Sequence, residues 1–161
     1  ASISLDGVCL TVVEFSEHTA SFDIIYETLS RTTLSKVQIG DMINVERAMK
    51  FGDEIGGHNV SGHIDNMAEI INIDTPENNH IVKLKIPDNY MPYIIEKGYI
   101  ALDGCSLTIA EVFDEGFNVC LIPETLRRTT FGFKKEGDLV NFEIEANTKA
   151  IVDSINKKKG E

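Results

Sequence analysis

The sequence has few basic residues and few cysteines for its length. Its 15 Lys and Arg are outnumbered by 26 Asp and Glu, so the formal net charge is -11 at pH 7. Sequence-independent binding of nucleic acid needs clustered Lys and Arg. The only dense basic run is Lys157-Lys158-Lys159, which we interpret as a solvated tail. The composition therefore argues against a nucleic-acid-binding protein.

Long apolar runs are also missing. No run approaches the roughly 20 residues of a membrane-spanning helix, and no signal-peptide pattern is present. Three cysteines without a CxxC pair suit neither a disulfide framework nor a zinc site, so a reducing cytoplasm is expected. What is present is a chain of 161 residues, 42% of them hydrophobic, which suffices for one large domain or two small ones.

Part of the sequence is an internal repeat. The stretch LDGVCLTV begins at Leu5 and returns as LDGCSLTI at Leu102, which sets an offset of 97 residues. The same offset matches ETLSRTT to ETLRRTT and GDMINVE to GDLVNFE, and about two-fifths of the aligned positions are identical. The repeat predicts two similar domains that arose by duplication.

The local pattern predicts mostly strands. Short stretches rich in Val, Ile, Phe and Thr are separated by turn residues, which is typical of small barrels or sandwiches. Asp6-Gly7 and Asp103-Gly104 suit tight turns, because Gly tolerates a positive φ. The fold class expected from the residues is therefore all-β.

Three helices interrupt the strand pattern. Short ones are expected at the ETL stretch after Pro123 and at 88–95, where Asp88 is the candidate cap. The longest covers 147–159, where Ile151 and Ile155 belong to an apolar stripe with Val152. That stripe packs either on its own barrel or on another subunit.

The two copies differ in length ahead of their Asp-Gly turns. Residues 62–100 precede the second turn, whereas the offset puts the counterpart of Gly62 about 36 residues ahead of Ala1. A barrel short of two strands would expose unpaired edges and core. Either these residues exist in the native protein, which we favour, or another element completes the first barrel.

Strand alternation separates the three cysteines. A lone Cys in a strand is usually a small buried hydrophobe, and we expect this of Cys105 and Cys120. Because neighbouring strand residues face opposite sides, Cys9 shares a face with Thr11, and Ser106 shares the matching face with Thr108. Cys9 is thus the counterpart of Ser106, and each copy presents a short polar side chain followed by Thr.

The segment 50–65 carries four glycines and two histidines. His58 and His63 do not form a zinc motif, and no phosphate-binding glycine motif is present. The segment is either a flexible linker or a place where the backbone approaches a ligand while a histidine handles protons.

Two other repeated features have alternative interpretations. Thr28 and Thr125, in the ETL motif, are either helix caps or ligand hydroxyls. The Asn-x-Glu pair at Asn44 recurs at Asn141, and it binds a polar ring edge or pairs with a neighbouring Arg.

Together these motifs identify a resemblance. The doubled G-x-[CS]-L-T-[VI], the doubled ETL-x-RTT and the central GGH-x-x-SGHI resemble riboflavin synthase of the alpha-subunit type, over the whole chain. The family's N-terminal stretch, beginning Met-Phe-Thr-Gly-Ile-Val, is the part that has no match here. At Glu145 the family often has Asp.

The resemblance implies two tandem six-stranded Greek-key barrels, at 1–58 (incomplete at its start) and 59–146, and an oligomerisation helix at 147–161 that joins a homotrimer. It implies a cytoplasmic transferase that needs no cofactor and no metal. This enzyme dismutates two molecules of 6,7-dimethyl-8-ribityllumazine to riboflavin and 5-amino-6-ribitylaminouracil. The two substrates would bind related faces of an N-terminal barrel and a neighbouring subunit's C-terminal barrel.

The resemblance also implies the residues of the site. The expected catalytic residues are Cys9, His63, Ser106 and Thr108. His63 would assist the transfer of a proton from the acidic C7 methyl group, and the other three would polarise or add to the ring. The expected substrate-binding residues are Cys9, Leu10, Thr11, Asp23, Ile24, Ile25, Tyr26, Glu27, Thr28, Gly62, His63, Ile64, Lys97, Ser106, Leu107, Thr108, Ile122, Pro123, Glu124, Thr125, Leu126 and Arg127.

Two other functions are weighed against this one. A non-catalytic lumazine- or flavin-binding antenna protein of the same superfamily would typically have lost the second copy's motifs, whereas both copies are intact here. A scaffold module would need no paired polar faces. The intact motifs favour the enzyme.

Overall fold

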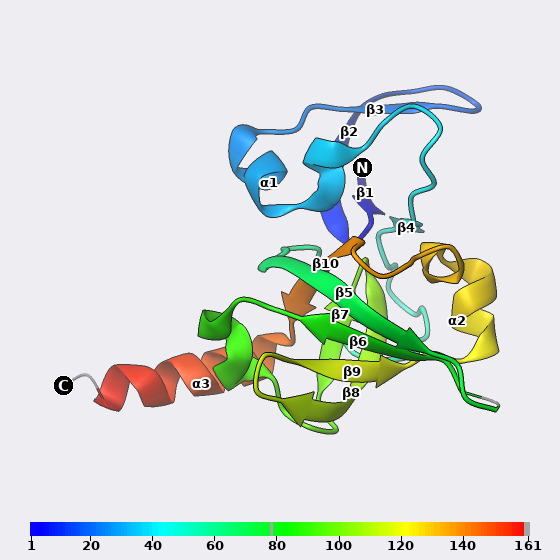
Figure 1. Cartoon of the computed structure of the whole chain (residues 1–161). Helices are drawn as coiled ribbons and strands as arrows, with labels where there is room; N and C mark the ends of the chain where they lie inside the picture. Colours follow the sequence, from blue (N-terminus) through cyan, green and yellow to red (C-terminus); the bar gives the residue numbers. More distant parts are fainter. Residues whose placement is uncertain (78, 160–161) are drawn as a thin grey trace.

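The computed structural model describes residues 1–77 and 79–159. Within these residues the chain forms a closed barrel of six strands and an open four-stranded sheet (Figure 1). A long helix leaves the barrel and carries the C-terminal end of the chain away from both sheets (Figure 1). The all-β prediction is therefore confirmed.

The closed barrel is antiparallel throughout and follows the order β10-β5-β6-β9-β8-β7. Alternate side chains of its strands point inward, and Ile70, Leu84, Phe117 and Phe142 are completely buried there. The strands are β5 (Asn66–Asp74), β6 (Ile81–Lys85), β7 (Tyr99–Leu102), β8 (Cys105–Phe113), β9 (Gly116–Cys120) and β10 (Leu139–Ile144).

The open sheet has a much smaller core. Val8, Leu10 and Leu34 are its buried hydrophobic residues, whereas Phe15 is 85% exposed. Its strands follow the order β3-β2-β1-β4. They are β1 (Ser2–Leu5), β2 (Val8–Phe15), β3 (Ala20–Phe22) and β4 (Val45–Arg47).

The open sheet corresponds to four neighbouring strands of the barrel. The offset of 97 residues places β1, β2, β3 and β4 on β7, β8, β9 and β10. The barrel closes because β5 and β6 lie between β9 and β10. No counterparts of β5 and β6 occur in the open sheet among the described residues, so the predicted pair of barrels is seen as one barrel and one open sheet.

The two Asp-Gly turns form the predicted tight connections and pack on each other. Asp6 and Gly7 have φ of 44° and 81°, and Asp103 and Gly104 have φ of 45° and 84°. A Cβ atom on Gly7 would lie 2.6 Å from the backbone nitrogen of Gly104. The backbones of the two halves therefore meet here with no room for a side chain.

Asn44 and Asn141 join the two halves. The Asn141 Oδ1 accepts from the Thr33 backbone N–H at 2.8 Å, and its Nδ2 donates to the Asp6 carbonyl at 2.9 Å. Asn44 makes the two equivalent bonds to the second half: its Oδ1 accepts from the Thr130 backbone N–H, and its Nδ2 donates to the Asp103 carbonyl. Both predicted roles of these residues, binding a ring edge or pairing with Arg, are thus wrong, because their amides satisfy backbone groups of the other half.

Two pairs of short helices follow the repeat. They are α1 (Tyr26–Arg31) with η1 (Thr33–Lys36), and α2 (Pro123–Arg128) with η3 (Thr130–Gly132). Neither α1 nor α2 has a side-chain cap at its start. Thr28 and Thr125 lie inside these helices, so their interpretation as caps is wrong.

The element η2 (Asp88–Tyr93) is a 3-10 helix rather than the α-helix expected at 88–95. Pro92 lies inside it and lacks a backbone N–H, which favours the tighter and shorter form. Asp88 is its first residue and caps nothing, because Pro87 occupies the cap position.

The C-terminal helix α3 (Ala146–Lys159) is confirmed, and it runs alongside η2. Lys149 pairs with Asp65, and the Tyr93 hydroxyl donates to Asp153 at 2.5 Å. Ile151 and Ile155 remain 61% and 48% exposed, whereas Val152 is half-buried. Among the described residues, no helix has the length and apolar character that a membrane crossing requires.

Candidate functional site

The strands β2 and β8 present equivalent polar faces. In β2, Val8 and Leu10 point into the core while Cys9 and Thr11 point outward. In β8, Cys105 and Leu107 pack against the barrel core, and Thr108 is exposed on the other face. The equivalence of Cys9 and Ser106 follows from this alternation. Leu10 and Leu107, expected in the ligand walls, turn their side chains inward and offer only backbone to the outer face.

The cysteines have three different environments. Cys9 is exposed, and Cys105 is partly buried with a pKa raised to about 12, chiefly by desolvation. The prediction that Cys120 is buried is wrong, since its thiol is exposed. It ends β9 between the buried Val119 and Leu121, so the alternation turns it outward. In the sequence, the apolar residues on both sides of Cys120 made the whole stretch look buried.

The Ser61-Gly62 peptide covers the backbone and Cβ of Cys9, while the Cys9 thiol remains exposed. The Cys9 backbone N–H donates to the Gly62 carbonyl at 2.9 Å, and Gly62 has φ of +81°. A Cβ atom there would come within 2.4 Å of the Cys9 Cβ. The Glu143 carboxylate holds this peptide by accepting from the Ser61 N–H, the Ser61 hydroxyl and the Gly62 N–H at 2.7, 2.9 and 2.8 Å.

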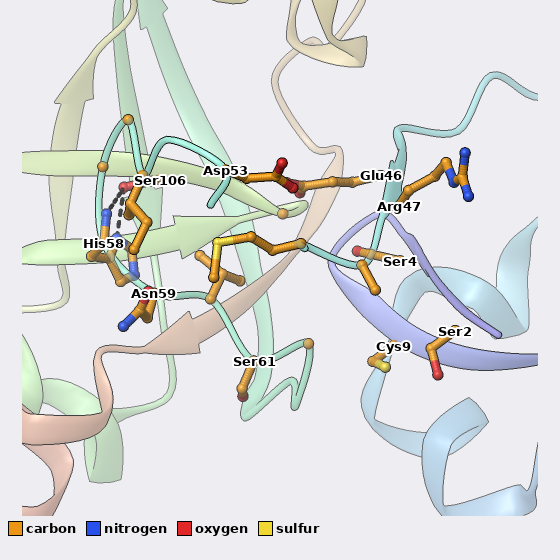
Figure 2. A pocket seen from close by; sticks show the side chains of 18 of the residues that line it. Ser2, Ser4, Cys9, Glu46, Arg47, Asp53, His58, Asn59, Ser61 and Ser106 are labelled. Carbon is orange, nitrogen blue, oxygen red and sulfur yellow. Dashed lines mark hydrogen bonds between the residues drawn. The ribbon is translucent and has the colours of Figure 1, made fainter. Parts of the chain in front are cut away.

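Ser106 is covered by Gly57 and His58. The His58 backbone N–H donates to the Ser106 hydroxyl oxygen at 3.1 Å, and the ring Nδ1 lies 2.6 Å from the same oxygen (Figure 2). The ring stacks on Tyr99 with centroids 5.2 Å apart. Burial lowers the pKa of His58, which favours the neutral ring. The expected site residues did not include His58; its signal was the Gly-Gly-His stretch.

Cys9 and Ser106 line one pocket from opposite halves. This pocket has a volume of about 640 Å³ and lies between the first strands of the open sheet, the 50–62 segment and β8 (Figure 2). The segment is therefore not a free linker, because it covers both polar positions. Gly62 is the third expected site residue that lines the pocket.

The other expected residues of the central segment, and Lys97 ahead of β7, lie outside this pocket. His63 is exposed, and its Nδ1 lies 3.0 Å from the Ser61 hydroxyl rather than near Ser106. Ile64 packs against the small core of the open sheet. Lys97 is exposed with φ of +65° and donates its backbone N–H to Ile109.

The two expected ETL walls are also outside the pocket, at 23–28 and 122–127. Tyr26 and Ile122 are largely exposed. Arg127, expected to contact substrate, forms an ion pair with Glu124 within its own helix. The helices α1 and α2, which carry part of these walls, lie far apart in the chain (Figure 1).

Buried carboxylates lie where the halves meet. Asp103 is 1% exposed, and desolvation raises its pKa to about 7 even though the Lys134 ammonium lies 3.0 Å away. Asp6, its repeat counterpart, also has a raised pKa because of burial. Asp103 accepts from the Asn141 backbone N–H and Asp6 from the Asn44 backbone N–H, and neither lines the pocket shared by Cys9 and Ser106.

The chain matches the family model of a lumazine binding domain at residues 1–48 and 61–145. Its structure is similar to LumP complexed with riboflavin, with a TM-score of 0.80 and 29% identity over 89% of this chain and 77% of that one. It is also similar to LumP complexed with 6,7-dimethyl-8-(1'-D-ribityl) lumazine, with a TM-score of 0.79 and 27% identity over 88% and 76%. Both repeats of the chain therefore match the lumazine binding domain family.

Sequence comparison is more specific. Riboflavin synthase from Escherichia coli K12 is 51% identical over 158 residues, which cover 98% of this chain and 74% of that protein. Riboflavin synthase from Chlamydia trachomatis is 46% identical over 96% of this chain and 76% of that protein. The chain belongs to the riboflavin synthase family, and it spans about three-quarters of the length of these relatives.

Proposed function

We propose that the chain catalyses the dismutation of two molecules of 6,7-dimethyl-8-ribityllumazine to riboflavin and 5-amino-6-ribitylaminouracil. A four-carbon unit passes from one lumazine to the other, so the atoms balance without an oxidant, a reductant or a cofactor. The observation that carries this proposal is the pair of equivalent polar faces, with Cys9 and Thr11 on β2 and Ser106 and Thr108 on β8.

Two copies of one binding face suit a reaction between two copies of one substrate. Holding both rings in place converts a bimolecular step into a positioned one, which lowers the barrier by several kcal/mol. The faces differ at one position, where a thiol in the first half replaces a hydroxyl in the second. This difference supports a division between the lumazine that loses a proton and the lumazine that accepts the carbanion.

In the second half, Ser106 is the proposed polarising group. The neutral His58 ring accepts its proton and thereby raises the electron density on the hydroxyl oxygen. The His58 Nε2 is buried without a hydrogen-bond partner among the described residues, which leaves one ring position for a polar group of the substrate. Thr108, two residues along the same face, would hold a ribityl hydroxyl.

In the first half, Cys9 is the proposed polarising or adding group, and His63 assists proton transfer. His63 follows Gly62 directly, and the exposed side chains of Cys9 and His63 are both open to a ligand. Neither the Cys9 thiol nor the His63 ring is buried. Asp23 to Thr28 and Ile122 to Arg127, with Lys97, complete the proposed walls around each bound ring.

The proposed assembly is a cytoplasmic homotrimer joined by α3, with 1–58 and 59–146 as its barrel domains and 147–161 as its helix. The exposure of Ile151 and Ile155 supports a subunit contact along α3. In this assembly the first-half face of one subunit meets the second-half face of its neighbour. We propose that counterparts of β5 and β6 complete the first barrel.

The test is an incubation of the chain with the ribityllumazine alone. We expect one riboflavin for every two lumazines consumed, measured by absorbance and by chromatography of both products. The Ser106→Ala variant should lower kcat/KM about tenfold or more, while Cys120→Ser, which changes an exposed thiol outside the pocket, should leave it unchanged. Tight binding without product would instead identify an antenna protein, and neither binding nor product would indicate a scaffold.

A further inference from the structure

The Asp-Gly turns of the two halves hold their aspartates in the same way. Asp6 Oδ1 accepts from the Asn44 backbone N–H at 2.8 Å, and Asp103 Oδ1 accepts from the Asn141 backbone N–H at 2.7 Å. Both residues are buried, with exposed fractions of 5% and 1%. The repeat therefore places two buried carboxylates in equivalent backbone surroundings where the halves meet.

A lysine pairs with Asp103, but the repeat gives Asp6 no equivalent partner. The Lys134 Nζ lies 3.0 Å from the Asp103 Oδ2 and donates to the Leu139 carbonyl at 3.3 Å. The offset of 97 residues puts Val37 in the place of Lys134 in the first half. Within 1–77 and 79–159, the Asp6 carboxylate forms no ion pair, and its hydrogen-bond donor is the Asn44 N–H.

The environment of Asp6 disfavours its charged form. Desolvation raises the pKa of Asp6 by more than the Asn44 N–H and the Lys134 charge lower it. A buried carboxylate without a paired cation is costly, and a cation placed beside it offsets that cost. A ligand that brings a positive charge to Asp6 would therefore bind favourably.

A cavity of about 540 Å³ reaches Asp6 at the contact between the halves. Asp6 and Met42, the repeat counterpart of Leu139, belong to its lining, whereas Asp103 does not. The cavity thus opens onto the carboxylate of the half that lacks the lysine. It has no lining residue in common with the pocket of Cys9 and Ser106.

The rest of this cavity combines apolar walls with unpartnered hydroxyls. Val37, Met42 and Phe133 line it, and all three are exposed to solvent. Thr33 and Thr130 also line it, and their Oγ1 atoms are buried without a hydrogen-bond partner among the described residues. Thr130 as a whole is 9% exposed. Such a lining suits a small ligand with an aliphatic part and a polar, cationic head.

We propose that this cavity binds the ammonium group of a short aliphatic amine, with its nitrogen between the Asp6 carboxylate and the Met42 carbonyl. This position is the repeat counterpart of the Lys134 Nζ, which lies between the Asp103 carboxylate and the Leu139 carbonyl. A primary ammonium has three N–H donors and so bonds both oxygens at once. The ligand supplies from solution the cation that Lys134 supplies from the chain.

Lys36 is the competing cation from the chain itself. It lines the cavity, is exposed and forms no ion pair in the part of the chain that the structure describes. Its repeat counterpart is Phe133, so the repeat gives Lys36 no role equivalent to that of Lys134. Asp41 and Asp138 line the cavity as well, but each accepts from a backbone N–H of its own turn. Asp6 remains the carboxylate that the amine would bind.

The first experiment titrates n-butylammonium chloride into the chain and follows the backbone amide resonances by NMR. We expect saturable shifts at Asp6 and Met42, and none with n-butanol, the neutral isostere, or with sodium chloride at equal ionic strength. Asp6→Asn should weaken binding about tenfold or more, because the charged acceptor is lost. Asp41→Asn is the matched control: it removes one charge from the same cavity and should leave binding unchanged.

A second variant tests the site without removing Asp6. Val37→Lys introduces a lysine at the counterpart of Lys134, so it should raise the thermal unfolding midpoint by about 2–4 °C and abolish the response to the amine. Val13→Lys is its control. Val13 is exposed on β2 and outside the cavity, so the same added charge there should do neither.

Three results would overturn the proposal. They are equal binding of n-butylammonium by Asp6→Asn and the parent chain, equal binding of n-butanol and n-butylammonium, and the absence of binding by the parent. Binding that appears only in Lys36→Met would assign the site to Lys36 and also contradict a ligand. The proposal does not depend on turnover, because the cavity is separate from the pocket of Cys9 and Ser106.

Discussion

The Asn141 side chain of the barrel donates to the Asp6 carbonyl of the open sheet at 2.9 Å, across 135 residues of sequence. With its second bond, from the Thr33 N–H, this completely buried amide links the turn and the short helix of the other half. Its counterpart Asn44 does the same in the other direction. The halves are thus joined by specific polar contacts as well as by packing.

Replacing Asn141 should therefore separate the halves. Asn141→Ala leaves a buried carbonyl and a buried N–H without partners, so we expect a loss of about 2–3 kcal/mol in the free energy of unfolding. Asn44→Ala is the control, because Asn44 is less buried and its bond to the Asp103 carbonyl is longer, at 3.2 Å. Urea unfolding measures both, and equal losses would argue against a burial effect.

The stability of the chain should fall as the pH rises toward neutrality. Asp103 has a pKa of about 7 in the folded chain against 3.8 as its ordinary value, so the folded state binds more protons between these limits. Stability is greatest below pH 3.8 for this group and is lost as the pH rises through 7. Asp103→Asn should flatten the profile in that window, as measured by urea unfolding at several pH values. An unchanged slope would count against this group as the cause.

Thiol labelling should distinguish the three cysteines. Cys9 and Cys120 are exposed, whereas Cys105 is partly buried and has a pKa raised to about 12. We expect two fast-reacting thiols at neutral pH and one slow thiol. Cys9→Ser and Cys120→Ser should each remove one fast phase, and Cys105→Ser should remove neither. Three fast phases in the folded chain would be incompatible with this structure.

Gly62→Ala should disturb the cover over Cys9. A non-glycine residue at a left-handed φ costs about 1–2 kcal/mol, and a clash with Cys9 adds to this. Gly137→Ala, at φ of +88° with open space around it, isolates the backbone cost alone. The difference in unfolding free energy between the two variants measures the contact. Faster labelling of the Cys9 thiol in Gly62→Ala would be a second indication that this contact has been disturbed.

The His58–Ser106 contact should act as a unit in turnover. Ser106→Ala and His58→Ala should each lower kcat/KM about tenfold or more, and the double variant should be little worse than either. Additive losses would mean that the two residues act separately. Tyr99→Leu, which removes the ring that stacks on His58, should give a smaller loss by loosening the histidine.

Sequence reasoning predicted the parts of the fold that depend on local pattern and on the repeat. Stretches rich in Val, Ile, Phe and Thr predicted the strands, and alternation predicted the outward face shared by Cys9 and Thr11. The Asp-Gly turns have the positive φ expected of them. The prediction was less accurate where two local signals competed. Pro92 makes η2 a 3-10 helix, and the apolar neighbours of Cys120 suggested a buried thiol where the strand alternation turns it outward.

The contacts between the two halves could not be predicted from the local sequence pattern. The roles of Asn141 and Glu143 depend on backbone groups of distant segments, and a strand pattern does not encode which segment will lie opposite. His58 was missed for the same reason, since its partner Ser106 lies 48 residues further along the chain. Strand alternation identified the polar faces, and the family resemblance implied Gly62 but not His58, which contacts Ser106.

The contact between Gly7 and Gly104 has an evolutionary consequence. Each glycine is the wall against which the other is packed, so neither position can gain a side chain while its partner stays in place. After the duplication, the two copies were free to diverge where they face different surroundings, as Cys9 and Ser106 did. At the glycine contact the two copies could not diverge independently, because a side chain added to one glycine would collide with the backbone of the other.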